Sequence, residues 1–216
     1  MRKLTATVLA GAAALAAFGT LHAQNGPAQL PGQVDVGRVS AGTYVVDKNH
    51  TLVGWRANHF GFNDYFGIFG SVEGTLTIDP AKPEAAKVDV TIPISSVVTA
   101  SAGLTDHRLR AGRDGGKPDF FGPSPAPAKF VSTKVESTGG TTANITGNLT
   151  MNGVTKPVVI AAEFTGAGAN PMSRVQTIGF EGRTVIKRTD FGISFAAPMV
   201  SDEVELDISA AFEKQG

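Results

Sequence analysis

The chain has 216 residues, contains no cysteine, and balances 19 basic residues against 19 acidic ones. The absence of cysteine excludes disulfides, thiolate catalysis and cysteine-ligated metals, and the balanced charge provides no electrostatic footprint for nucleic acid. The 26 glycines, together with many valines and threonines, favour strands and turns over helices.

The N-terminus has the pattern of an export signal. Arg2 and Lys3 precede an apolar run over residues 4–18, and a site ending in the small residue Ala23 follows. A membrane-spanning anchor would need about 20 apolar residues, more than this run contains. We therefore expect residues 1–23 to be a signal peptide that is cleaved after Ala23.

The next segment is a candidate linker. Residues 24–42 mix Gln, Gly, Pro and Asn with isolated apolar residues and show no period, which indicates a flexible linker. Residues 43–214 have the length of one domain and are enough to bury a core. We expect the whole fold to lie in this second segment.

Four stretches alternate apolar and polar residues with the period of a half-buried strand. They cover residues 71–79, 87–92, 144–151 and 204–212. Each has one apolar and one polar face, which is typical of antiparallel sheets. Weaker strand patterns cover residues 43–47, 52–58, 130–136, 156–164 and 174–187. The pattern predicts an all-β domain of eight or nine strands.

Local signals add a hairpin and a short helix. Asn152-Gly153 favours a type I′ turn, which needs positive φ at both central residues, so residues 144–151 pair with the strand that follows. A helical period occurs only around residues 104–110, where Ser101 or Thr105 could cap the helix.

Antiparallel strands with one apolar face stack as two sheets or close into a barrel. Closure removes the exposed edges, and an eight-stranded barrel is about the size that holds one small ligand. Gly74 and Gly147 lie on the apolar faces, where glycine marks a bend, a close backbone approach or open space.

Two aromatic-rich segments, residues 55–69 and 119–121, do not follow the period of two and are interpreted as irregular. Their rings form an apolar wall at a pocket mouth or plug one end of the barrel, and both readings stay open. The candidate ligand contacts that these segments contribute are Trp55, His59, Phe60, Phe62, Phe66, Phe69 and Phe120.

The three histidines of the exported part, His50, His59 and His107, match no compact metal motif, so we expect no metal site. Arg188 and Asp190 continue the apolar face of the strand over residues 174–187. A charge on such a face must be paired, so the two residues form a buried ion pair with each other or with a histidine, or Arg188 contacts the head group of a ligand.

Catalytic motifs are absent from the sequence. It contains no G-x-S-x-G elbow, no H-E-x-x-H pair, no phosphate loop and no dinucleotide fingerprint. We expect no cofactor and no enzymatic activity. No basic amphipathic helix indicates attachment to a membrane surface, and stable membrane insertion is not expected.

Several short motifs resemble, in order, those of the YceI-like family. They are YVVDKNHT (44–51), VGW (53–55), DHRL (106–109), DFF (119–121), KFVS (129–132), GNLTMNGVTKPV (147–158) and IKRTDFGI (186–193). The resemblance covers essentially all of the predicted domain. Residues 111–118 and 122–127 depart from the family pattern and are expected to reshape one pocket wall, so the family's ligand does not carry over directly.

The resemblance implies a lipocalin-like antiparallel eight-stranded β-barrel with a short helix, located in the periplasm. It implies a carrier that binds a long apolar molecule, such as an isoprenoid, a fatty acid or an amide, and it leaves a homodimer open. Candidate ligand contacts then also include His107, Phe130, Arg188 and Phe191. Apolar length is expected to dominate affinity, with His59, His107 and Arg188 setting the head-group preference.

Two other functions stay open at this point. A hydrolase or isomerase of lipidic substrates would need polar groups that converge deep in the pocket. A ligand-free interaction module would have a barrel that is filled by its own side chains.

Overall fold

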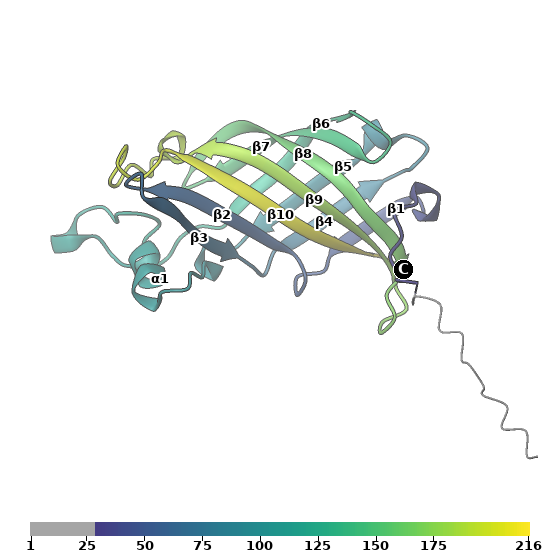
Figure 1. Ribbon diagram of the computed structural model, residues 1–216, viewed down its shortest axis with the longest axis horizontal. Coiled ribbons are helices and arrows are strands. Elements are labelled where there is room, and N and C mark those ends of the chain that lie inside the picture. Colours follow the sequence, from purple (N-terminus) through teal and green to yellow (C-terminus); the bar gives the residue numbers. More distant parts are fainter. Residues whose placement is uncertain (1–28) are drawn as a thin grey trace, which may run out of the picture.

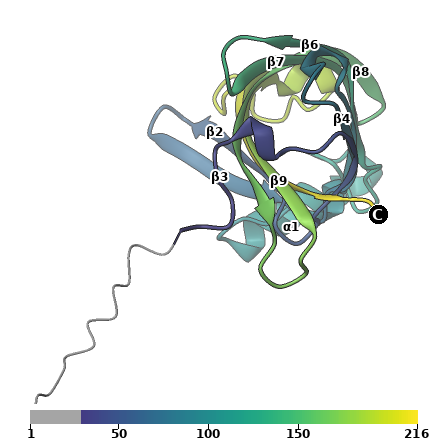
Figure 2. The same ribbon diagram turned by 90° about the vertical axis from the view of Figure 1, so that its right-hand side faces the viewer.

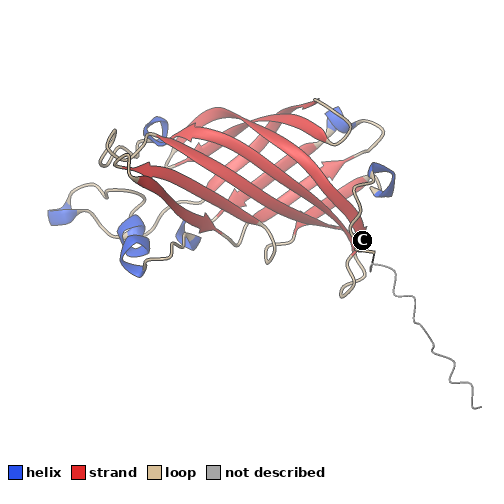
Figure 3. Cartoon of the chain, viewed as in Figure 1, coloured by secondary structure: helices blue, strands red, loops and turns tan. Residues whose placement is uncertain are grey.

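The structure is a computed structural model that describes residues 29–216, so the predicted signal peptide lies outside the described residues. Ten strands form one antiparallel sheet with small helices around its ends (Figures 1 and 3). The strands are β1 (Gly42–Val46), β2 (Leu52–His59), β3 (Asn63–Phe69), β4 (Glu73–Ile78), β5 (Lys87–Ile92), β6 (Ala128–Ser137), β7 (Thr142–Met151), β8 (Val154–Ala169), β9 (Gln176–Lys187) and β10 (Glu203–Lys214).

Helical segments are few and short. The single α-helix among residues 29–216 is α1 (Ala102–Leu109), which confirms the predicted helix, with Ser101 at its N-cap position. The 3-10 turns are η1 (Val36–Arg38), η2 (Pro83–Ala85), η3 (Ile94–Ser96), η4 (Arg113–Gly115) and η5 (Arg188–Phe191). No helix in the described part of the chain is long and apolar enough to span a membrane.

The sheet closes on itself and confirms the eight-stranded barrel. Strands run in the order β1-β4-β5-β6-β7-β8-β9-β10, and pairing between β1 and β10 joins the two ends. The closing register places Tyr44 opposite Lys214 and Val46 opposite Phe212. Seen along its axis, the molecule is a ring of strands (Figure 2). The apolar faces predicted from the period of two thus point into one enclosed interior.

The β2–β3 hairpin extends the barrel wall at the end that carries α1 (Figure 1). After β1 leaves β10, the same edge of β10 pairs with β2, with Ser209 opposite Leu52 and Glu205 opposite Arg56. On its outer edge, β3 pairs with no other strand among residues 29–216 and forms the isolated bridge between Ile68 and Val98. This hairpin is where the structure departs most from the sequence prediction.

The interpretation of residues 55–69 as irregular is wrong, because β2 and β3 cover nearly all of that segment. Alternation fails along β3 because this strand carries apolar side chains on both faces. Phe66 and Ile68 point outward and are exposed, whereas Tyr65 and Phe69 on the other face are half-buried. A period of two appears only where one face is polar.

The linker interpretation is wrong for residues 33–42, which pack on the barrel. Gln33 exchanges two backbone hydrogen bonds with Ala167 of β8, at 3.1 and 2.9 Å, and Val39 is buried. Gly168 permits this approach, since a Cβ there would lie 2.0 Å from the carbonyl oxygen of Pro31. The run of small residues at the end of β8 was the sequence feature that could have indicated this close approach.

The Asn152-Gly153 turn confirms the predicted hairpin. Both residues have positive φ, 51° and 77°, and the flanking residues Met151 and Val154 pair across the two strands. The Asn152 side chain also donates a 2.9 Å hydrogen bond to the Phe191 carbonyl. The turn thereby ties the β7–β8 hairpin to η5.

Gly74 provides a test of the barrel wall. Its φ is +138°, and a Cβ would lie 2.2 Å from the backbone oxygen of Asp89 on β5. We expect Gly74→Ala to lower the free energy of unfolding by about 2 kcal/mol or more, because strain and overlap act together. Gly103→Ala in α1 is the control, since nothing lies near its Cβ and alanine favours the helix by up to about 1 kcal/mol. Equal stability of the two variants in urea unfolding would contradict this account.

Candidate functional site

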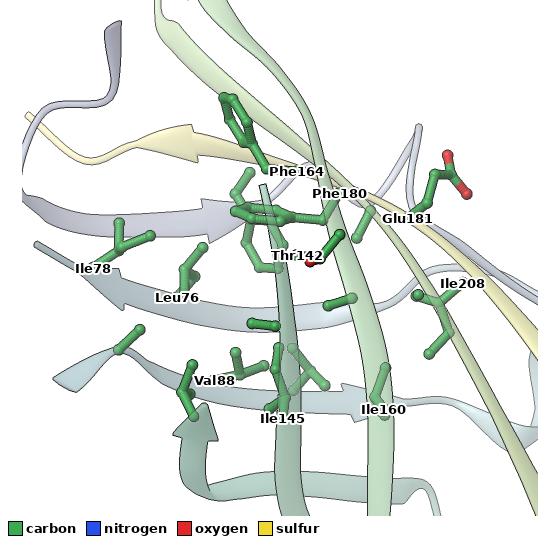
Figure 4. A pocket seen from close by; sticks show the side chains of 18 of the residues that line it. Leu76, Ile78, Val88, Thr142, Ile145, Ile160, Phe164, Phe180, Glu181 and Ile208 are labelled. Atoms are coloured by element: carbon green, nitrogen blue, oxygen red, sulfur yellow. The ribbon is translucent and has the colours of Figure 1, made fainter. Parts of the chain in front are cut away.

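An apolar cavity of about 350 Å³ lies inside the barrel. Side chains from opposite walls point into it, among them Leu76 of β4, Val88 of β5, Ile145 of β7 and Ile208 of β10 (Figure 4). Glu181, the acidic residue beside them, points away from this space (Figure 4). The volume is at the lower end of the range for small-molecule pockets, about 300–1,000 Å³.

The cavity reaches the end of the barrel opposite α1. Its lining there includes Val36 of η1, Val39 at the end of η1, Pro83 of η2, and the β6–β7 turn at Gly139 and Gly140. Ser137, Thr141 and Thr142 add polar groups at this rim. The segment that was predicted to be a linker therefore supplies part of the cavity mouth.

The inner part of the cavity ends against a layer of aromatic residues. Phe130 of β6 lines the cavity and crosses Gly147, where a Cβ would lie 2.4 Å from the ring atom Cζ. Gly147 thus serves a close approach between strands and not an empty space. Val53 and Leu206 also line the cavity, and Leu206 is the strand partner of Trp55. Trp55 itself does not line the cavity, and its indole lies across Gly67 of β3.

Aromatic rings fill the end of the barrel near α1. Phe69 and Phe121 pack edge to face at 6.2 Å, and Phe120 packs against His107 at 5.1 Å and Phe195 at 5.6 Å. Of the predicted contacts, Trp55, Phe69, His107 and Phe120 are brought together here. The arrangement favours a barrel-end plug over a pocket mouth for these rings.

The other predicted contacts are dispersed. Phe60, Phe62 and Phe66 of the β2–β3 hairpin are 45%, 87% and 60% exposed, and His59 packs on Phe60 at 4.2 Å outside the cavity. Phe191 is buried in the core. Phe130 alone among the predicted contacts lines the cavity, so a role for the others in ligand contact stays a prediction.

Arg188 is a buried anchor for the segment that leads from η5 to β10. Its guanidinium donates to the carbonyls of Ile193, Phe195, Val200 and Ser201 at 2.8–3.0 Å. The predicted ion pair is wrong: Asp190 is exposed and Arg188 pairs with neither it nor a histidine. Arg188 and Asp190 were expected to continue the apolar face of the strand, but β9 ends at Lys187 and η5 turns the chain there. Burial lowers the pKa of Arg188, with Asp202 opposing.

A charged cluster ties α1 to the segment that follows it. Asp119 accepts from His107 Nε2 at 2.7 Å and from Arg110 at 3.1 Å. The hydrogen bond from His107 is the main cause that lowers the pKa of Asp119, and Arg110 acts in the same direction against partial desolvation. This cluster holds residues 119–121 against the barrel end.

Sequence reasoning missed Arg108. Its guanidinium carbon stands 3.9 Å above the Phe120 ring centre, with the Trp55 and Tyr65 ring centres at 5.5 and 5.6 Å. Burial lowers the pKa of Arg108, a nearby Tyr65 raises it, and the charge of Arg188 lowers it. In the sequence, Arg108 cannot be distinguished from an arginine that points into solvent. The only available signal was the presence of aromatic segments nearby in the chain.

Sequence reasoning also missed the aliphatic residues that line the cavity. Leu76, Ile145 and Ile160 line the cavity, and two of them stand on faces that the period of two had marked as apolar. The period of two already indicated which residues point inward. When the inward side chains do not fill the barrel, these same residues line the space that remains. Aromatic composition directed the prediction to the other end of the barrel, near α1.

A closed antiparallel barrel with an apolar interior cavity is the class of protein that this fold and site define. A family model described as the YceI-like domain matches residues 44–212, and the chain belongs to this family. Curated relatives include a UPF0312 protein of Azotobacter vinelandii, 42% identical over 83% of this chain and 91% of its own length. A UPF0312 protein of Pseudomonas putida is 38% identical over 84% and 92%.

Solved structures share the fold. Burkholderia cenocepacia BcnA has a TM-score of 0.62 with 25% identity and covers 77% of this chain and 98% of its own. The Campylobacter jejuni YCEI protein has a TM-score of 0.61 with 29% identity over 74% and 90%. A polyisoprenoid binding domain from Saccharophagus degradans has a TM-score of 0.56 with 12% identity over 80% and 98%, which shows a common fold alone.

Replacement of Arg188 tests its structural role. We expect Arg188→Met to lower the free energy of unfolding by about 3 kcal/mol or more, because four backbone carbonyls lose a charged donor. Arg183→Met is the control, since Arg183 forms an exposed ion pair with Asp207 that is worth about 0–1 kcal/mol. Thermal and urea unfolding measure the stability of both variants. An Arg188→Met variant as stable as the wild type would contradict the structural role of Arg188.

Acidification tests the charged cluster. The pKa of Asp119 is lowered from its ordinary value of 3.8, so its stabilising effect is complete above the unfolded-state pKa. It is lost as the pH falls through the folded-state pKa. We expect the wild type to lose more stability than Asp119→Asn between about pH 5 and pH 2. Parallel pH profiles of the two proteins would exclude this contribution.

Proposed function

We propose that this protein binds a long apolar chain, such as a polyisoprenoid, a fatty acid or an amide, inside its barrel and carries it without chemical change. The observation that supports this best is the cavity, whose walls are mostly aliphatic or aromatic. The name of the Saccharophagus degradans domain, a polyisoprenoid binding domain, is consistent with a prenyl chain.

The physical gain is removal of the chain from water. Each buried methylene contributes about 0.8 kcal/mol, so ten of them contribute roughly 8 kcal/mol before the costs of association and ordering. Along β10 the lining runs from Leu206 to Phe212, which is roughly 20 Å at 3.4 Å per residue. The cavity therefore suits an extended chain better than a compact ring system.

The apolar lining favours binding over catalysis. A hydrolase or isomerase would need converging acid, base or nucleophilic groups. The polar lining residues Ser137, Thr141 and Thr142 stand at the mouth. Thr51 and Thr184 line the wall elsewhere, and the Glu181 side chain points away from the cavity. A ligand-free interaction module is disfavoured by the open interior space. The N-terminal signal pattern supports a periplasmic location for the carrier.

Two adjacent alanines on β8 offer a matched test. Ala162 lines the cavity and Ala161 is exposed on the outer face. We expect Ala162→Phe to weaken the binding of geranylgeraniol, a neutral prenyl alcohol, by about tenfold or more, because the new ring occupies ligand space. Ala161→Phe adds the same ring outside and should leave affinity unchanged.

Titration calorimetry with both variants measures the effect, and circular dichroism checks that each one folds. Equal affinity of the two variants would place the ligand outside the barrel. Failure of the wild type to bind geranylgeraniol, palmitic acid and palmitamide would refute the carrier function.

A further inference from the structure

The segment that precedes β1 lies across one end of the barrel. Residues 29–41, here called the strap, include η1, and the purple part of the chain crosses the opening of the ring of strands (Figure 2). Val36 and Val39 of the strap line the cavity, yet Val36 is also 50% exposed. At Val36, one side chain therefore separates the cavity from solvent.

The end of the barrel near α1 is closed more firmly. The rings of Phe69 and Phe121 pack edge to face there, and Asp119 is held by hydrogen bonds from His107 and Arg110. An apolar chain that left the cavity at this end would have to separate the rings and break the charged cluster. At the opposite end the strap is the segment in its way.

Few polar contacts hold the strap on the barrel. Gln33 exchanges two backbone hydrogen bonds with Ala167 of β8, at 3.1 and 2.9 Å. The Gln176 side chain donates to the Arg38 carbonyl, and the Tyr44 hydroxyl donates at 2.7 Å to a carbonyl near the start of β1. These four hydrogen bonds, and no ion pair, join the strap to the other residues that the structure describes. Water replaces such bonds when the strap lifts, so each contributes little to holding it.

The strap is organised within itself. Arg38 donates to the Pro31 carbonyl at 3.1 Å, and the Asp35 side chain accepts from the Gly37 N–H at 2.9 Å. Where the strap joins β1, Gly42 has a φ of +146°, which side chains other than hydrogen disfavour. The strap is thus a compact unit that is linked to the barrel through a glycine, a connection suited to movement of the whole unit.

The barrel surface beneath the strap consists of small residues. Gly166, Ala167 and Gly168 follow one another on β8, and a Cβ at Gly168 would lie 2.0 Å from the carbonyl oxygen of Pro31. A larger side chain there would hold the strap away from the barrel. The surface is shaped for the strap, whereas the hydrogen bonds to it are few, and segments with few stabilising contacts are the ones that open locally.

We propose that the strap is the gate of the cavity, and that the apolar ligand enters and leaves at this end when the strap lifts from β8. This inference rests on the proposed carrier function and specifies the route that the ligand takes. Lifting the strap removes Val36 and Val39 from the cavity wall and uncovers the rim at Thr141 and Thr142. The opening of the strap then limits the rate of ligand exchange.

A disulfide between the strap and β8 tests the gate. The chain contains no cysteine, so the double variant Gln33→Cys/Ala167→Cys has one pair of thiols. Residues that exchange both hydrogen bonds have Cα atoms about 5.5 Å apart, a separation that a disulfide spans. We expect the oxidised variant to take up geranylgeraniol about tenfold or more slowly than the same variant after reduction, because a closed lid blocks exchange.

Timed native mass spectrometry measures uptake, and a free-thiol assay checks the cross-link. A variant that is loaded first and oxidised afterwards should release geranylgeraniol more slowly by a similar factor. Under the same oxidant, the single variants Gln33→Cys and Ala167→Cys should exchange the ligand as the wild type does.

A second pair of variants tests the gate without a cross-link. The added methyl group of Gly168→Ala displaces the Pro31 carbonyl and loosens the strap, so uptake and release should both become about threefold or more faster. Gly32→Ala is the matched control within the strap, since nothing lies within 4 Å of its Cβ. Circular dichroism checks that both variants keep the fold.

Two results overturn the gate and leave the carrier function standing. One is a cross-linked protein that takes up geranylgeraniol as fast as its reduced form, which places the route of entry elsewhere. The other is Gly168→Ala exchanging the ligand no faster than Gly32→Ala. Absence of binding by the wild type and by the reduced double variant refutes the carrier function, and the gate with it.

Discussion

The pairing of β1 with β10 is the contact on which the rest of the molecule depends. Val46 opposite Phe212 joins the first strand to the last, so that eight inward apolar faces share one interior. An open sheet of the same strands would expose those faces and two edges. Closure fixes the circumference, and the circumference determines how much space the inward side chains leave unfilled.

The two ends of this interior differ chemically. Near η1 and η2 the barrel has an open, mostly apolar cavity that ends in a few hydroxyl groups. Near α1 it is filled by aromatic rings, and two arginines lie there. Arg188 donates to four backbone carbonyls, whereas Arg108 stacks on ring faces. The interior therefore has an open apolar half and a filled half that carries two arginines.

Much of the architecture follows from the sequence. The period of two marks β4, β5, β7 and β10, and Asn152-Gly153 specifies its turn because few other residue pairs accept positive φ twice. β3 was missed because its outer face is apolar as well, which removes alternation. The segment near Gln33 was missed because its partner is the glycine-rich end of β8, a long-range contact without a local signature.

The site was harder to predict than the fold. Aromatic residues attract attention, yet most of them pack at the barrel end or on the hairpin surface, whereas common aliphatic residues such as Leu76 and Ile145 line the cavity. Arg108 has no sequence feature that separates it from a solvated arginine. Its setting arises only when α1 places it over rings from β2, β3 and the segment after α1.

Native mass spectrometry of the protein purified gently from its native cells tests the central claim, that the cavity holds an apolar chain. We expect the folded protein to carry one bound apolar molecule, which organic solvent releases and which tandem measurement identifies. A folded protein that is recovered only at its bare mass, and that takes up no prenyl or acyl chain when these are added, would contradict the account.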